Sequence, residues 1–283
     1  MNFYSDDPEQ EAIFQRLRAV GGHPQIREIH AQVDLIAGYR LSQAERAPYL
    51  KFHDFITNPQ PSFISTWRAD PKLGRWYHRL VNGVLGDVQS TFGCVLYHVT
   101  NIQRMESAIE GVIAKLDKSI LGNVTVGGGD TSKINFEYQA FIFAYRRVLD
   151  YLARALASYF RIDCNSFRTF DRSLKTTIFP SVSAALVEVH RTRLPLFDFV
   201  ASEGNRKSVR DKLAHYEAIS AGFLNLSIRN GQLVGGGEEL GLATGHTISL
   251  SHALDRRVQD LRETVKDFLY TFVSEARKLE AQP

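Results

Sequence analysis

The sequence of 283 residues contains only two cysteines and two methionines. Cys94 and Cys164 lie far apart, each in apolar surroundings, which excludes a disulfide-rich scaffold and a cysteine-rich metal site. The chain has 18 phenylalanines, so we expect a core of aromatic side chains rather than one of flexible thioethers. The 44% of hydrophobic residues is typical of a globular protein.

Long hydrophobic runs and a large net charge are also lacking. No uncharged apolar stretch reaches the roughly 20 residues that a membrane span needs. The N-terminus, residues 1–7, shows neither the basic region nor the apolar run of a signal peptide. We therefore expect a cytoplasmic protein that does not contact membranes. The net charge of +3 is too small to indicate nucleic-acid binding by itself.

Signatures of metal and cofactor chemistry are absent from the sequence. The glycines at 127–129 are not followed by the Gly-Lys-Ser/Thr ending of a phosphate-binding loop, and no Gly-x-Ser-x-Gly elbow or Cys–His pairing is apparent. The closest histidine pairs, 23/30 and 246/252, lack the spacing and the carboxylates of a metal site. We expect no metal ligands and no cofactor.

Helical periodicity dominates what is present. Apolar residues recur at steps of three and four, which predicts helices over about 72–120, 134–162, 176–201 and 249–278. Glycines 83, 86 and 93 predict a kink or break in the first of these helices, between residues 83 and 93, and the apolar run at 94–97 leaves a strand there as the alternative. Pro195 predicts a bend or split near residue 193 in the third.

Two shorter signals complete the predicted fold. Ser42 followed by Glu45 forms a capping box, which predicts that a helix over 42–57 begins there. Apolar residues alternate over 224–228 and are followed by Asn230–Gly231, which predicts a β-hairpin over about 222–235. The predicted fold class is all-α, a helical bundle with long helices and one small β-hairpin.

A glycine-rich stretch divides the chain. Residues 121–132 are the best candidate linker, so we predict an N-terminal helical region over 1–121 and a second helical domain over 130–283. A continuous bundle formed by both regions is the alternative, because the long helix that ends near residue 120 could pack on the helices that follow.

The most informative segment is Ser208–Tyr216, which has the spacing of a short amphipathic helix. Arg210 and His215 lie five residues apart and so flank one face of that helix. Asp211 and His215 are neighbours on adjacent turns. Six Lys or Arg residues fall between Arg191 and Lys212, which indicates either a basic patch or a solvated helix face.

This segment resembles the signature of the HEPN superfamily, an Arg followed after four to six residues by a His, with a polar residue often directly after the Arg. Here these residues are Arg210, His215 and Asp211. Two long helices before the segment and one after it also match the order of elements in HEPN domains. The resemblance covers roughly residues 130–283.

The resemblance implies a homodimeric, metal-independent endoribonuclease that leaves a cyclic phosphate and a free 5′-hydroxyl. His215 would move protons, Arg210 would stabilise the charged phosphorane, and Asp211 would orient His215. Tyr216, Lys212 and Arg206 would bind RNA. The family also implies a toxin, phage-defence or stress role and a cognate inhibitor or antitoxin protein.

Two alternatives remain open at this stage. The motif could be structural, with Arg210 paired to an acid and His215 hydrogen-bonded at the surface, in a non-catalytic module for interaction, dimerisation or nucleotide binding. Separately, Trp67 and Trp76 with nearby arginines could form a nucleic-acid platform, although a helical core with a solvated edge explains them as well.

Overall fold

The computed structural model describes residues 15–16, 19–57, 62–121, 123–124, 126–174, 178–201, 208–215, 222–226, 231–235 and 250–281. The chain forms two compact units, residues 1–41 and 42–283. The first contains α2 (Pro24–Ala37), which starts with a proline in its first turn. All elements described below belong to the second unit.

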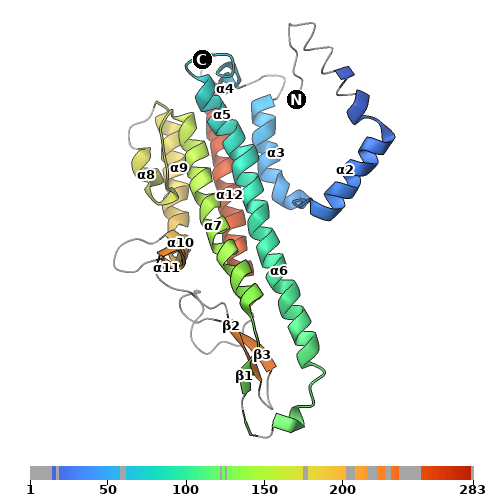
Figure 1. Ribbon diagram of the computed structural model, residues 1–283. Coiled ribbons are helices and arrows are strands. Elements are labelled where there is room, and N and C mark those ends of the chain that lie inside the picture. The colour runs from blue at the N-terminus through green and yellow to red at the C-terminus, as the bar shows by residue number, and fades with distance from the viewer. Residues whose placement is uncertain are drawn as a thin grey trace. The chain divides into compact units, whose positions relative to one another are not determined.

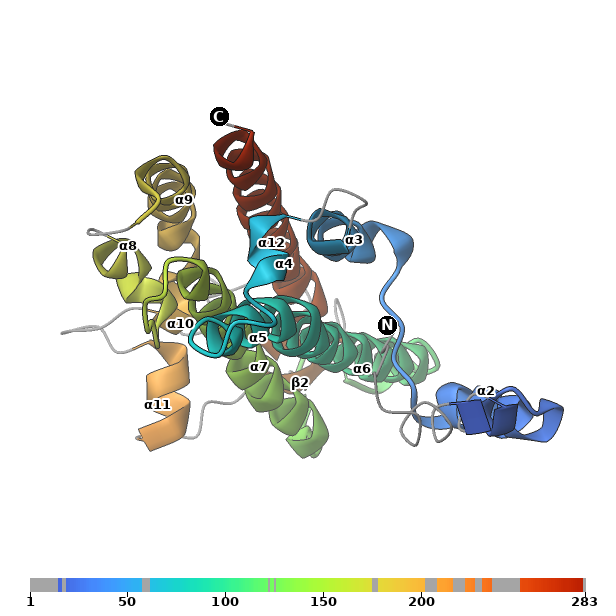
Figure 2. The same ribbon diagram turned by 90° about the horizontal axis from the view of Figure 1, so that it is seen from above.

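Long helices build the second unit, which confirms the predicted all-α bundle (Figure 1). The longest are α6 (Gln89–Ile113), α7 (Ser132–Tyr159) and α12 (Leu250–Glu280). α12 packs between α3 (Gln43–Thr57) and α9 (Pro180–Arg193), as the view from above shows (Figure 2). None of the helices described is both long and apolar enough to cross a membrane. The short helical elements are α4 (Phe63–Thr66), α5 (Gly74–Asn82), η2 (Lys118–Leu121), η3 (Phe167–Thr169) and α8 (Phe170–Ser173).

The boundaries of two predicted helices shift. α9 begins at Pro180 rather than at residue 176, because proline lacks the N–H that an interior helical position needs and suits the first turn instead. α7 ends at Tyr159 rather than at residue 162. Arg161, just beyond this end, adopts a positive φ of 59°. The split predicted at Pro195 is confirmed, since α9 gives way to a 3₁₀ turn, η4 (Leu194–Phe197), and then to α10 (Asp198–Ala201).

The region predicted to kink or break between residues 83 and 93 changes helix type without interruption. α5 runs directly into a π-helical segment, η1 (Gly83–Val88), which continues into α6. A π turn takes up one extra residue while the backbone hydrogen bonds continue. Gly83 is buried in this segment and faces α7, because a Cβ added to it would lie 2.8 Å from the Cβ of Ala155.

Gly83 and Gly86 should respond in opposite ways to alanine. Gly83→Ala forces a clash with Ala155 and should lower the free energy of unfolding by about 1–3 kcal/mol. Gly86 is exposed with no atom near its absent Cβ, so Gly86→Ala should raise the stability by up to about 1 kcal/mol. Urea unfolding of both variants tests this, and equal effects would contradict the close packing at Gly83.

The predicted capping box forms at the start of α3 and also connects α3 to α12. The backbone N–H of Ser42 donates to Glu45 Oε2 at 2.7 Å, and that of Glu45 donates to Ser42 Oγ at 3.3 Å. The second carboxylate oxygen of Glu45 accepts a hydrogen bond from Arg262 Nη2 of α12 at 3.0 Å. One side chain therefore caps its own helix and anchors it to a second helix.

Aromatic side chains fill the core, as the composition predicted. The ring of Phe272 in α12 lies 5.9 Å from those of Phe52 and Phe55 in α3, and 5.0 Å from that of Tyr159 in α7. Phe272 itself is fully buried. Three helices that are distant in the sequence thus meet at one ring.

The two tryptophans belong to this core and not to an exposed platform. Trp67 and Trp76 are 3% and 6% exposed. The guanidinium groups of Arg75 and Arg79 lie over the Trp76 ring, 4.6 and 5.3 Å from its centroid. This arrangement matches the helical core with a solvated edge, and it leaves no indole face for stacking a base.

The predicted hairpin forms and is extended by a third strand. β2 (Gly222–Leu226) pairs antiparallel with β3 (Gly231–Gly235), and β1 (Val126–Gly128) pairs antiparallel with β2. β3 packs on α6 and α12, and the sheet lies near the N-terminal end of α7 (Figure 1). The predicted turn residue Asn230 lies outside the described residues. β1 was not predicted, because a strand of valine and glycine carries no alternating side-chain pattern.

The predicted linker at residues 121–132 does not separate the long helices in space. α6 precedes it, α7 follows it, and these two helices pack extensively on each other within one compact unit. This matches the alternative of a continuous bundle. The division into an N-terminal helical region over 1–121 and a second helical domain over 130–283 stays a prediction.

His190 of α9 is a buried imidazole with one hydrogen bond. Its Nε2–H donates to the carbonyl oxygen of Phe167 at 2.7 Å, and its Nδ1 has no partner within the described part of the chain. Burial lowers the pKa of His190, and the charge of Arg191 adds to this, against opposing contributions from the Phe167 carbonyl and Asp171. The folded protein therefore favours the neutral imidazole.

We expect His190 to reduce stability in acid. Because its folded-state pKa lies below the ordinary value of about 6.5, the unfolded chain binds the proton first as pH falls. The stabilising contribution is present above about pH 6.5 and is lost as pH falls through the lower folded-state pKa. Glu280 acts oppositely in this window, since burial raises its pKa to about 7.

The effect is best measured as a difference between two proteins. His190→Gln keeps an N–H donor for the Phe167 carbonyl but does not titrate. The stability advantage of wild type over this variant should shrink between about pH 7.5 and pH 5.5 in denaturant unfolding. An advantage that stays constant, or that grows in acid, would contradict a neutral buried His190.

Candidate active site on α11

The segment with the Arg–His signature forms the short helix α11 (Val209–His215), which packs on α7 and α10. Ser208 caps it, since its Oγ accepts the backbone N–H of Asp211 at 3.1 Å and its carbonyl oxygen accepts that of Lys212 at 3.0 Å. Val209 is 5% exposed and anchors the helix to the bundle. The predicted amphipathic helix is confirmed over these residues.

Two arginines hold the C-terminal end of α10, against which α11 packs. Arg146 of α7 donates through Nη1 to the carbonyl oxygen of Val200 at 3.0 Å, and Arg168 donates to that of Ala201 at 3.1 Å. These are the last carbonyls of α10, which lack partners within their own helix. Arg146 is held in turn by Asp150 at 2.9 Å. The end of α10 is therefore held by part-buried hydrogen bonds.

Within α11, Arg210 and Asp211 pair with each other. Arg210 Nη1 donates to Asp211 Oδ1 at 2.8 Å, and the two side chains are 38% and 31% exposed. His215, at the other end of the helix, is exposed. Arg210 and His215 thus both reach solvent from one helix. Asp211 was expected to orient His215, whereas the geometry observed places its carboxylate against Arg210.

The other candidate residues are only partly described. Lys212 is half-buried on α11, while Arg206 and Tyr216 lie outside the described residues. Of the basic residues predicted to form a patch, Arg191 is exposed, and Arg193 donates from Nε to Asp267 of α12 at 3.0 Å. Arg193 therefore holds α9 to α12 and contributes less free charge to a patch than its position in the sequence indicated.

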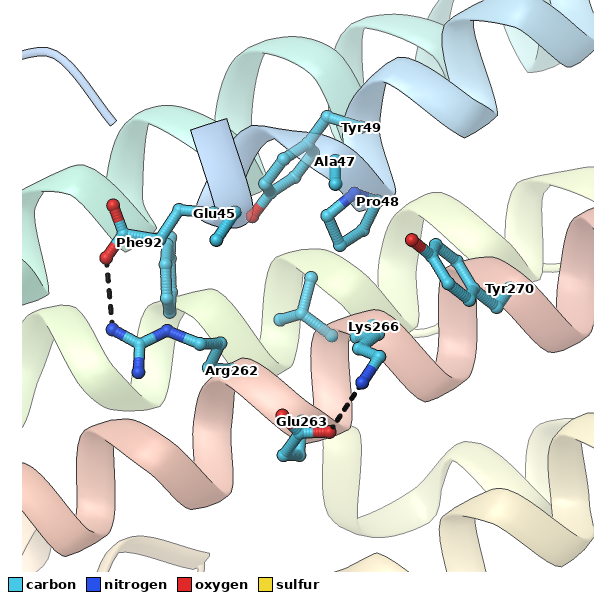
Figure 3. Close-up of a pocket in the computed structure, with 11 residues that line it drawn as sticks. Glu45, Ala47, Pro48, Tyr49, Phe92, Arg262, Glu263, Lys266 and Tyr270 are labelled. Carbon is cyan, nitrogen blue, oxygen red and sulfur yellow. Dashed lines mark hydrogen bonds and ion pairs between the residues drawn. The ribbon is translucent and has the colours of Figure 1, made fainter. Parts of the chain in front are cut away.

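A separate pocket of about 250 Å³ opens between α3 and α12 (Figure 3). Its charged side chains form two pairs. Arg262 donates to Glu45, and Lys266 Nζ donates to Glu263 Oε2 at 3.0 Å. Burial raises the pKa of Glu45, but hydrogen bonds from Ser42 and Arg262 outweigh this and lower it. The remaining lining is largely apolar or aromatic: Ala44, Ala47, Pro48, Tyr49, Phe92, Val265 and Tyr270.

Tyr49 is the unusual member of this lining. It is 3% exposed, and its hydroxyl has no hydrogen-bond partner among the residues described. Burial, with a smaller contribution from the charge of Glu45, raises its pKa well above the ordinary value, so the hydroxyl stays protonated.

One polar cluster was missed by the sequence analysis. Cys94 and His98 lie one turn apart on α6, with 3.3 Å between Sγ and Nε2, and His98 Nδ1 lies 2.5 Å from Glu137 Oε2 of α7. The expectation of no Cys–His pairing was therefore wrong. The Cys-x-x-x-His spacing was a signal for the first contact, because residues four apart on a helix are neighbours.

Within the described residues, no group of three or more His, Cys, Asp or Glu side chains converges as a metal site would require. No family model matches the chain, and no curated protein or solved structure is significantly similar to it.

Proposed function

We propose that this protein is a metal-independent endoribonuclease of the HEPN type, with Arg210 and His215 in the catalytic roles. The observation that carries the proposal is the exposure of both side chains on one capped, anchored helix, α11. A histidine kept only for packing would be buried in the bundle, as His190 is. His215 instead faces solvent, where a proton-transfer group can meet a substrate.

The residues of α11 suit cleavage by the ribose 2′-hydroxyl. His215 takes the 2′-hydroxyl proton as the oxygen attacks the adjacent phosphorus, and a protonated imidazole gives a proton to the departing 5′-oxygen. The products are a cyclic phosphate and a free 5′-hydroxyl. Arg210 donates from its guanidinium to the phosphate oxygens, whose negative charge grows in the transition state.

Asp211 keeps Arg210 in place between catalytic cycles. Its carboxylate occupies one edge of the guanidinium in the free protein, at 2.8 Å. An RNA phosphate can bind the remaining N–H donors, since a guanidinium carries five. Lys212, Arg206 and Tyr216 contribute charge and a stacking surface for RNA.

We propose that two copies of the chain bring their α11 helices together to complete the site. In this arrangement one histidine acts as the base and the other as the acid. An inhibitor or antitoxin protein that covers α11 would keep the nuclease inactive in the cytoplasm. A toxin, phage-defence or stress role fits such a controlled activity.

A second function is favoured by the Arg210–Asp211 pair itself. A guanidinium already paired within its helix is what a structural motif would contain, and α11 would then serve a non-catalytic module for dimerisation or ligand binding. In that case Arg210→Ala would change the oligomeric state or ligand binding, and no RNA cleavage would be found.

The test is incubation of RNA of mixed sequence with the protein in EDTA, followed by analysis of the product ends. We expect cleavage that leaves cyclic-phosphate and 5′-hydroxyl ends. The specific activity should rise with protein concentration as dimers form. Cleavage that requires Mg²⁺ and leaves 5′-phosphate ends would contradict the proposal.

A further inference from the structure

Four polar side chains form a hydrogen-bonded row between α6 and α7, away from the Arg–His motif on α11. Cys94 Sγ lies 3.3 Å from His98 Nε2, and His98 Nδ1 lies 2.5 Å from Glu137 Oε2. The other Glu137 oxygen accepts a hydrogen bond from Asn101 Nδ2 at 3.0 Å. Each side chain of the row thus contacts the next, and the last of them, the Asn101 amide, holds the Glu137 carboxylate in place.

The order of these groups sets where the protons are. An ionised carboxylate only accepts, so the His98 hydrogen sits on Nδ1 and is donated to Glu137. Nε2 then presents a lone pair to Cys94, whose S–H can donate to it. A nucleophile, a base within hydrogen-bond reach and a third group that orients the base are the features of an activated nucleophile.

Exposure and charge distinguish Cys94 from the second cysteine. Cys94 is exposed, whereas Cys164 is 2% exposed and donates its S–H to the Ser166 carbonyl at 3.3 Å. Burial raises the pKa of Cys94, and Glu137 adds to this, while the positive charge of Arg147 opposes it. The resting thiol is therefore protonated and depends on a base to react.

We propose that Cys94 is a modification site whose thiol, assisted by His98, exchanges with small anionic disulfides. The S–H proton moves to His98 Nε2 as Cys94 Sγ attacks one sulfur of the disulfide. A new S–S bond forms, the old one breaks, and the departing thiolate takes the proton from His98. The disulfide is the oxidant, and each exchange leaves one mixed disulfide on α6.

Arg147 defines the kind of disulfide. It is an exposed cation of α7, the helix that packs on α6, and its positive charge opposes the rise in the pKa of Cys94. An anionic reagent gains from this charge on approach, and a neutral one does not. Glu137 and Asn101 act only through His98, so they are positioning residues for the exchange.

The test compares rates of reaction with the anionic disulfide dithiobis(nitrobenzoate). His98→Gln should lower the rate at neutral pH by about 10²-fold, the lower end of typical general-base contributions. Cys94→Ala should abolish fast labelling, and Cys164→Ala, the matched control, should leave it unchanged. Arg147→Gln should slow the anionic reagent but not the neutral dithiodipyridine.

The pH profile separates base assistance from a merely structural effect. In wild type, where His98 accepts the thiol proton, the rate should depend less steeply on pH than in His98→Gln. In that variant the rate should follow the ionisation of the thiol itself, and Glu137→Gln, which removes the carboxylate that orients His98, should make the profile steeper than in wild type. A His98→Gln variant that unfolds at the wild-type temperature and reacts within about twofold of wild type overturns the proposal. So does labelling confined to Cys164.

Discussion

Replacing Arg210 by alanine should lower the rate of RNA cleavage by about 10²–10³-fold, the loss typical when one donor to a developing oxyanion is removed. Arg210 is 38% exposed and contributes little to the core, so the variant should unfold at nearly the same temperature as wild type. Arg210→Lys should recover only part of the activity, because an ammonium cannot bind a phosphate through two parallel hydrogen bonds.

A matched control makes this result specific to α11. Arg191 is an exposed arginine on α9, so Arg191→Ala removes the same charge from a different helix. It should change cleavage far less than Arg210→Ala does. Equal losses in the two variants would indicate that overall charge, and not the position of Arg210, governs the reaction. Initial rates under single-turnover conditions provide the measurement.

Replacing Phe272 by alanine should destabilise the protein by about 3–5 kcal/mol. Its ring is fully buried and lies within 5.0–5.9 Å of three other rings, those of Phe52, Phe55 and Tyr159. Removing it opens a cavity where α3, α7 and α12 meet. For a unit of this size the unfolding temperature should fall by roughly 10 °C.

Phe136 of α7 supplies the comparison for this variant. Its side chain is 66% exposed, so Phe136→Ala removes the same atoms from a solvated position. We expect a change within about 0.5 kcal/mol. Calorimetric unfolding of both variants measures these two changes in stability. If Phe136→Ala proved as damaging as Phe272→Ala, the three-helix junction would not be the centre of the core.

Local signals predicted the fold well because they act within a few residues. The capping box of Ser42 and Glu45 formed with both of its hydrogen bonds, and Pro195 ended α9 where its missing N–H required. The hairpin strands also formed, since alternation and turn residues are local. The π-helical segment was not predicted, because glycines weaken an α-helix without indicating what replaces it.

Contacts between distant segments could not be read from the sequence in the same way. The Cys-x-x-x-His spacing places Cys94 beside His98, but only the packing of α6 on α7 brings Glu137 to the imidazole. The pairing of β1 with β2 likewise depends on the fold, which brings residues 222–226 beside residues 126–128. At the candidate site, the helix itself followed from periodicity. The Arg210–Asp211 pair could not be predicted, because it depends on the rotamers of both side chains.

The most direct test of the proposed nuclease is the yield of cyclic-phosphate ends from RNA in EDTA, measured for wild type and His215→Ala purified in parallel. His53→Ala, which removes an exposed histidine of α3, serves as the control. We predict that wild type and His53→Ala produce cyclic-phosphate ends and that His215→Ala, equally folded, produces almost none. Equal yields from His215→Ala and wild type would show that α11 does not carry the reaction.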